Sequence, residues 1–152
     1  MAKMKQFVII VLTVFFSASV LFALDTKTAM ADLDSEDEAK VVAAADYLGS
    51  KGEASAVAKL SALTEDPRTK VRLHSVMALG YINKEEAVDA LNKVLVSDKD
   101  AGVRYAALLA TVRIGSKKSQ DTLVQIKETE TDPMMKDLLD KIEKKAEKEK
   151  KK

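Results

Sequence analysis

The sequence contains no cysteine, no tryptophan and a single histidine, His74. The lack of cysteine excludes disulfides, thiolate metal sites, a cysteine nucleophile and a lipid-modified N-terminal cysteine. One histidine excludes a metal site built from several histidines. Aromatic residues make up only 5% of the chain and glycine occurs five times, whereas a β-sandwich needs many aromatic and β-branched residues and frequent turns. The composition therefore favours a helical protein and disfavours metal and thiol chemistry.

An excess of charge of one sign is also lacking. The chain has 25 basic and 24 acidic residues and a net charge of +1, which gives little support to a nucleic-acid-binding surface spread over the molecule. Only the C terminus is lopsided, because residues 141–152 hold seven lysines and three glutamates. Lysine is favoured near the C-terminal end of a helix, so we interpret this tail as a solvated helix end. Attraction to an anionic surface is the alternative.

One long apolar run, residues 7–24, carries no charge. Two lysines precede it and the motif Ala29-Met30-Ala31 follows it, an order typical of a secretory signal peptide over residues 1–31 that is cleaved before Asp32. The run is also just long enough to span a bilayer, so an uncleaved membrane anchor is the alternative. Both interpretations predict that the rest of the chain is exported to the periplasm or another extracytoplasmic space.

The sequence repeats itself at an interval of 32 residues. Val71-Arg72 is matched by Val103-Arg104, and the outer copies are looser, as terminal repeats are because one side faces water. Each copy has the apolar spacing of two amphipathic helices. Helices are therefore expected at residues 36–48, 54–65, 68–82, 85–97, 100–114, 117–129 and 133–149.

A single helical pair cannot bury its apolar side alone, so successive pairs must stack. The sequence thus predicts an all-α fold, a short right-handed α-solenoid of three to four helical pairs and about seven helices. The repeat domain is expected over residues 32–145, followed by the lysine-rich tail at residues 146–152.

Acidic and basic residues recur with the same period. Arg72 follows Asp66 by six residues, and Arg104 follows Asp98 by the same interval. Stacking of the copies predicts a ladder in which each arginine bonds an acid or a turn carbonyl of its own or the adjacent copy. Solvated surface charge, worth about 0–1 kcal/mol per pair, is the alternative. Recurrence favours the ladder, and its expected role is structural.

The segments DPRTKVRLHSVMALGYI and DKDAGVRYAALLATVRIG resemble HEAT-like repeats of the phycobilisome-lyase type. The resemblance covers about residues 34–145 and is strongest in the two central copies. Asp46 departs from it, because an apolar residue is expected there. The resemblance implies that the Val-Arg helices line the concave face and that the protein works as a protein-binding scaffold. It also includes bilin lyases, which implies a lyase-like or chaperone-like helper of a tetrapyrrole-binding protein as an alternative.

Some apolar residues of the Val-Arg helices point away from the core side of those helices. They form two rows on the presumed concave face, with Tyr81 nearby: Val41, Leu73, Tyr105 and Ala45, Met77, Leu109. An exposed apolar strip of this kind usually marks a partner site. Coverage of the rows by adjacent helices or by the N-terminal segment is the alternative.

Sequence signals of catalysis are few. No glycine-rich phosphate loop and no G-x-S-x-G motif occurs, and no orienting partner for His74 can be identified from the sequence. The sequence therefore predicts an exported, non-enzymatic scaffold without metal or cofactor, which binds a protein or peptide rather than nucleic acid. The alternatives are the tetrapyrrole-related helper and a structural envelope protein tethered by residues 7–24.

Overall fold

The computed structural model describes residues 25–150, and the side chains of residues 25–148. The apolar run and most of the predicted signal peptide lie outside these residues. Within them the chain is helical and contains no strand. The α-helices are α2 (Thr26–Asp32), α3 (Glu38–Lys51), α4 (Val57–Leu63), α5 (Thr69–Ile82), α6 (Val88–Ser97), α7 (Ala101–Ile114), α8 (Gln120–Thr129) and α9 (Pro133–Lys150). The 3₁₀ turns η1 (Ala54–Ala56), η2 (Glu85–Ala87) and η3 (Lys117–Ser119) lead directly into α4, α6 and α8.

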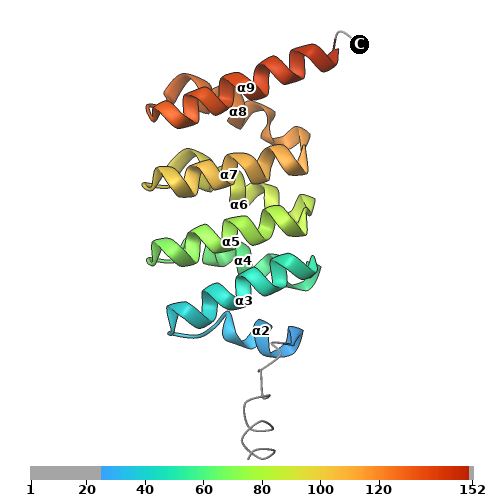
Figure 1. Cartoon of the computed structure of the whole chain (residues 1–152), viewed down its shortest axis with the longest axis vertical. Coiled ribbons are helices and arrows are strands. Elements are labelled where there is room, and N and C mark those ends of the chain that lie inside the picture. Colours follow the sequence, from blue (N-terminus) through green and yellow to red (C-terminus); the bar gives the residue numbers. More distant parts are fainter. Residues whose placement is uncertain (1–24, 151–152) are drawn as a thin grey trace, which may run out of the picture.

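The helices form a two-layer stack. Helices α3, α5, α7 and α9 lie one above another in the near layer, and α4, α6 and α8 lie behind them (Figure 1). Helix α2 lies at the N-terminal end of the stack, where it packs against α3. The predicted all-α solenoid is confirmed, and the seven expected helices correspond to α3 through α9. Helix α2 was not expected.

The first helix of each copy has defined ends. Asp37 caps α3 and Asp100 caps α7, each by accepting hydrogen bonds from backbone amides of the first turn, which would otherwise lack partners. The helices α3, α5 and α7 end at residues in the left-handed conformation, Gly52, Asn83 and Gly115, with φ of 64°, 56° and 66°. Such a residue stops a helix because the chain can no longer continue its right-handed path.

The interval between the first two copies differs from the one predicted. Helices α3, α5 and α7 begin at residues 38, 69 and 101, so the first interval is 31 residues and the second is 32. The left-handed residues at 52, 83 and 115 repeat both intervals. From the start of α4 to the start of α5 the chain advances 12 residues, against 13 from α6 to α7. The first copy is therefore one residue out of the predicted register.

This shift corrects the prediction that Val41 and Ala45 are exposed. A one-residue slip rotates a position by about 100° around a helix. In the 31-residue register Val41 is equivalent to Arg72, and Ala45 is equivalent to the core residue Val76. Their exposed fractions are 0% and 1%, respectively, so both belong to the interior.

The core lies between the two layers and runs the length of the stack. Its largest fully buried side chains come from both layers: Leu48, Leu60, Leu79, Leu91, Leu95, Leu108 and Met135. Helix α2 extends this core at the N-terminal end, because its residue Ala29 and the C-cap residue Leu33 are buried. The Lys59 Nζ atom also donates a hydrogen bond of 3.0 Å to the carbonyl of Met30. Helix α2 thus covers the end of the first copy.

Candidate functional site

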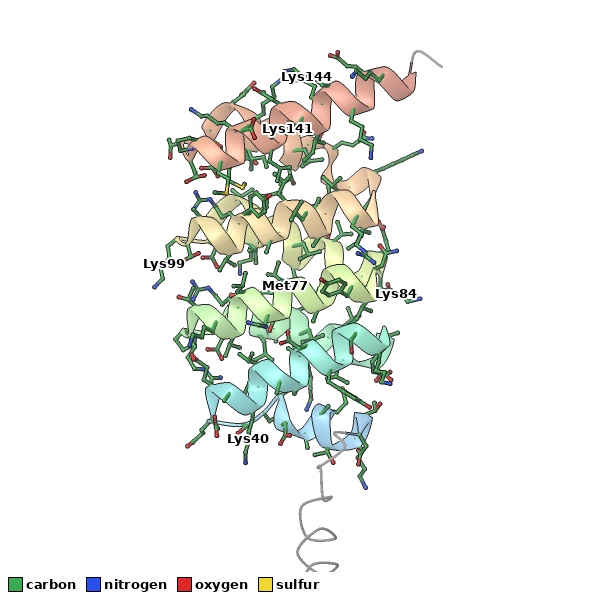
Figure 2. The ribbon with its side chains drawn as sticks, viewed as in Figure 1. Lys40, Met77, Lys84, Lys99, Lys141 and Lys144 are labelled. Carbon is green, nitrogen blue, oxygen red and sulfur yellow. The ribbon has the colours of Figure 1, made fainter. Side chains whose placement is uncertain are left out.

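An apolar groove of about 540 Å³ lies between α5 and α7. Leu73, Met77 and Tyr81 line it from α5, and Tyr105 and Leu109 line it from α7. The structure thus brings together five of the seven residues predicted for this face, and the buried Val41 and Ala45 are the two that it leaves out. Figure 2 shows Met77 on the open side of the near layer. The volume lies within the range of ordinary ligand pockets, roughly 300–1,000 Å³.

The groove exposes much of its apolar lining. The exposed fractions of Met77, Tyr81 and Leu109 are 37%, 53% and 45%, and they are among the most exposed large apolar side chains of the described residues. Leu73 and Tyr105 are half-buried and pack against the core. Side chains in this state have a solvated face to offer a partner, while their inner face holds them in place.

The floor of the groove is made of small residues. A Cβ atom added to Gly80 would lie 2.8 Å from the Cβ of Ala110, so α5 and α7 approach closely at this point. Gly102 and Ala106 complete the small-residue lining from α7. Because these residues add little side-chain volume, space remains above them between the larger side chains of the two helices.

The equivalent junction between α3 and α5 is occupied by a polar pair. Asp46 Oδ1 and His74 Nδ1 are 2.7 Å apart. In the registers set out above, Asp46 is equivalent to Met77, and His74 is equivalent to Ala106. Asp46, which departs from the apolar pattern, is therefore the partner of His74. The sequence analysis identified no partner for this histidine. The apolar lining begins only where Met77 and Ala106 replace this pair.

Arg113 is a lining residue that the sequence analysis missed. Its guanidinium carbon lies 5.3 Å from the centroid of the Tyr81 ring, a cation–π distance. The 32-residue period contains the signal, because Arg113 is equivalent to Tyr81 and follows Leu109 by four residues. It therefore extends the same helical row by one turn.

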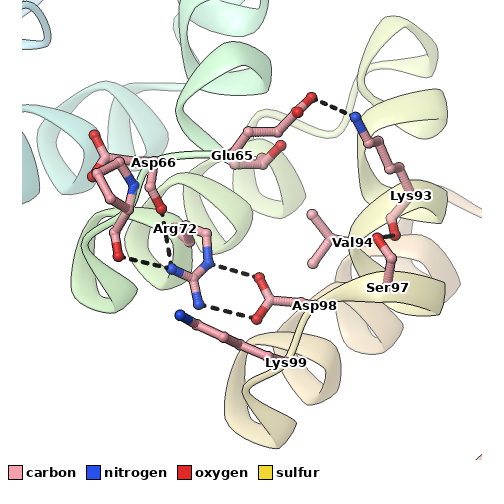
Figure 3. A pocket seen from close by; sticks show the side chains of 10 residues that line it. Glu65, Asp66, Arg72, Lys93, Val94, Ser97, Asp98 and Lys99 are labelled. Atoms are coloured by element: carbon pink, nitrogen blue, oxygen red, sulfur yellow. Dashed lines mark hydrogen bonds and ion pairs between the residues drawn. The ribbon is translucent and has the colours of Figure 1, made fainter.

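The predicted ladder residues meet at the opposite end of these helices. Arg72 Nε and Nη2 donate to the two carboxylate oxygens of Asp98 at 2.7 and 3.1 Å, and Arg72 Nη1 donates to the carbonyl of Asp66 at 3.0 Å. Figure 3 shows these bonds around the guanidinium group. The side chains of Arg72 and Asp98 are only 7% and 5% exposed. Arg72 therefore links the turn before its own helix to the acid of the next copy.

The same arrangement recurs one copy later. Arg104 Nε and Nη2 donate to the carboxylate of Glu130 at 3.0 and 2.9 Å, and Nη1 donates to the carbonyl of Asp98 at 3.0 Å. Glu130 was absent from the sequence prediction, although it lies 32 residues after Asp98. The 32-residue interval predicts Glu130 as the next acid of the ladder once glutamate is allowed at the position of Asp98.

The carboxylates of the ladder are held ionised by their partners. The hydrogen bond from Arg104, with the amides of Asp132 and Thr131, lowers the pKa of Glu130 from 4.5 to about 2 despite burial. Burial raises the pKa of Asp98, but hydrogen bonds from Arg72 and a backbone amide outweigh it and bring the pKa below its ordinary value. These groups are neutralised and enclosed, so the ladder offers structure rather than chemistry.

Asp66 takes part in the ladder differently from Asp98. Its carboxylate bonds Arg68, whose Nε and Nη2 lie 2.8 Å from the two oxygens. These bonds lower the pKa of Asp66. Only the backbone carbonyl of Asp66 reaches Arg72. The position equivalent to Arg72 in the first copy is the buried Val41, so Asp66 has no arginine of the preceding copy to bind and pairs within its own turn.

No helix within residues 25–150 is long and apolar enough to cross a bilayer. No group of three or more histidine or acidic side chains in that part of the chain is placed to hold a metal ion.

Comparison with known proteins places this architecture in a family. The HEAT_2 family model, described as HEAT repeats, matches residues 58–139, and no curated protein matches the sequence. A chain from "The structure of the complex of CpcE and CpcF of phycocyanin lyase from Nostoc sp. PCC7120" is similar, with 28% sequence identity and a TM-score of 0.64. The match covers 68% of this chain and 42% of that chain, so this protein spans less than half of the length of that relative. The chain belongs to the family of HEAT-repeat proteins.

Proposed function

We propose that this protein is an exported, non-enzymatic HEAT-repeat scaffold that binds a peptide segment of a partner protein in the groove between α5 and α7. The observation that carries the proposal is the alignment of apolar side chains from two successive repeats along one open groove. Burial of apolar surface drives association, and charged groups around an apolar centre select the partner. A preformed groove lowers the entropic cost of binding because its side chains are already held.

The groove is tested by Leu109→Ser. Leu109 is 45% exposed, so the substitution should cost little stability and should abolish binding of the partner peptide. Val96→Ser is the matched control, because Val96 is equally exposed at 45% but lies on α6, outside the lining. Partner binding is measured by cross-linking in envelope extract and mass spectrometry of the linked peptide. Loss of the fold in Leu109→Ser, or binding unchanged from the parent, would contradict the proposal.

Export is supported by the N-terminal pattern of two lysines, an apolar run and a small-residue motif. The intact mass of the protein recovered from the cell envelope tests it. A mass that lacks the apolar run shows cleavage. Full-length protein that is extracted only by detergent would instead favour a tethered envelope protein.

A second candidate function is supported by the similarity to a chain of the phycocyanin lyase complex at 28% identity. On this alternative the protein is a helper of a tetrapyrrole-binding protein. Titration of the purified protein with a bilin, followed by visible absorbance, distinguishes the two. A saturable spectral change that Leu109→Ser removes would favour the tetrapyrrole function over the peptide-binding function.

A further inference from the structure

We propose that the segment bound in the groove carries a carboxylate that pairs with Arg113, beside two or three apolar side chains that fill the space between α5 and α7. This inference rests on the proposed function and names the chemistry of the partner. It commits the groove to an acidic, amphipathic peptide segment. The argument starts from the charge of the groove and its surroundings.

Arg113 differs from the other arginines of the chain. The other three, Arg68, Arg72 and Arg104, each bond a carboxylate. Arg113 forms no ion pair with any side chain of residues 25–148. Its charge at the groove is therefore not neutralised by the part of the protein that the structure describes.

Two charged groups on the near layer, one on each side of the groove, are paired within the protein. On one side, Asp46 bonds His74 at 2.7 Å. On the other side, Lys141 of α9 bonds Asp137 at 2.6 Å. The lining of the groove is apolar along its length, and Arg113, at the end beside Tyr81, is its one charged residue. A partner with one acidic group beside apolar side chains complements this pattern.

The geometry at Arg113 suits a carboxylate. A guanidinium group is planar and carries five N–H donors at its edge. Its Cζ atom lies over the Tyr81 ring, 5.3 Å from the ring centroid, and this cation–π interaction favours the charge at this end of the groove. The forked donors of arginine bind a carboxylate in a bidentate manner, which the single ammonium group of lysine does less effectively.

The sequence explains why the junction between α3 and α5 lacks the carboxylate-binding groove found between α5 and α7. Tyr81 and Arg113 are equivalent to each other, and the same position in the first copy is Ser50. The residue of the first copy that is equivalent to Met77 is Asp46, which is paired with His74. The combination of an apolar groove, an aromatic ring and an unpaired arginine between α5 and α7 is therefore not repeated between α3 and α5. The site has room for only a short segment, because its volume is about 540 Å³.

The experiment selects short random peptides displayed on phage against the immobilised full-length protein, and measures the affinities of the selected peptides. We expect selected peptides to share an aspartate or glutamate next to apolar residues. Arg113→Gln should weaken them about tenfold, in line with the loss of a charge-assisted hydrogen bond. Replacing the acid of the peptide by its amide should weaken binding to the parent equally and should have no further effect on Arg113→Gln, as a double-mutant cycle requires.

Controls separate this inference from the proposed function. Lys40→Gln removes the same charge from α3, away from the groove (Figure 2), and should leave affinity unchanged. Peptides that lose binding in Leu109→Ser but bind Arg113→Gln as well as the parent would overturn the acidic partner and keep the groove. Peptides without acidic residues would do the same. Peptides indifferent to Leu109→Ser, or the selection of none, would overturn both.

Discussion

At the scale of single residues, the arginine of each Val-Arg pair has a defined task. Arg72 and Arg104 each donate to a turn carbonyl of their own copy and to the carboxylate of the next copy. Because these pairs are largely removed from solvent, loss of one partner leaves a buried charge without compensation. Their contribution therefore exceeds that of the exposed lysine pairs elsewhere on the surface.

Arg72→Ala should lower the free energy of unfolding by about 3 kcal/mol, because it leaves the buried Asp98 unpaired. The affinity for a groove ligand should change little in the fraction that stays folded. Chemical denaturation measures the first quantity and peptide titration the second. Lys99→Ala is the control, since Lys99 is exposed beside the same turn. A melting midpoint equal to that of the parent would show that the ladder adds nothing to stability.

Glu130 predicts a pH dependence. Its pKa is lowered from 4.5 to about 2 in the folded protein, so its contribution is fully present above about pH 4.5 and is lost as the pH falls toward 2. At pH 7 this contribution amounts to about 3 kcal/mol. Glu130→Gln should therefore be less stable than the parent at pH 7, and the difference should narrow below pH 4.5. Denaturation curves across this range test it, with a substitution in the last turn of α8, Glu128→Gln, as a control that should follow the parent.

At the scale of elements, short connections decide which residues face the core. The advance of 12 rather than 13 residues from α4 to α5 makes Val41 equivalent to the buried Arg72 rather than to the groove residue Leu73, and Val41 is itself buried. Helix α2 covers the end of the first copy through Ala29 and Leu33. End copies of a stacked fold need such a cover, because otherwise their apolar side faces water.

A chain that begins at Asp32 should therefore be less stable than one that begins at Asp25, by about 2 kcal/mol. The shorter chain lacks the buried Ala29, the partly buried Met30 and the carbonyl that Lys59 bonds, and it exposes apolar surface of α3. Thermal unfolding of both chains tests this. Removal of residues 146–152, a segment of the same length, is the control and should leave the midpoint unchanged. Equal stability of the two N-terminal variants would show that α2 is dispensable. Such a result would be compatible with cleavage before Asp32, which removes nearly all of α2.

The central copies could be predicted from sequence more fully than the ends. Their Val-Arg pairs, turn acids and apolar spacing predicted α5 through α8 closely and brought Leu73, Met77, Tyr105 and Leu109 to one face. The first copy lacks a Val-Arg pair, so nothing in its pattern revealed the 31-residue interval. Helix α2 was not predicted because its residues include the motif Ala29-Met30-Ala31, which was interpreted as a cleavage site. Arg113 was missed because arginine interrupts an apolar row, although the helical spacing continues through it.

At the scale of the whole molecule, one continuous core joins α2 to α9. The ladder adds links between the second and third copies and between the third copy and the turn before α9. The groove lies at the other end of the two helices that carry the ladder arginines, and the close approach of Gly80 to Ala110 sets the distance across its floor. A rigid groove of this kind lowers the entropic cost of binding, because its side chains are already ordered before a ligand enters.

The continuous core predicts a single cooperative unfolding transition. In a stack of repeats, cooperativity depends on the interfaces between neighbours, and here buried side chains from every copy belong to one cluster. The calorimetric enthalpy of unfolding should therefore equal the van't Hoff enthalpy. Two separate transitions would show that the end copies unfold independently of α5 through α8.

The position of the tyrosines gives the protein an intrinsic optical reporter. The sequence has no tryptophan, all four phenylalanines lie within residues 7–22, and the three tyrosines are Tyr47, Tyr81 and Tyr105. Two of these three line the groove, while Tyr47 lies under Lys51 on α3. In the part of the chain that the structure describes, near-ultraviolet absorption and emission thus arise mainly beside the groove. A Tyr47→Phe variant would confine the signal to the groove, so that occupancy by a colourless ligand becomes visible without a label.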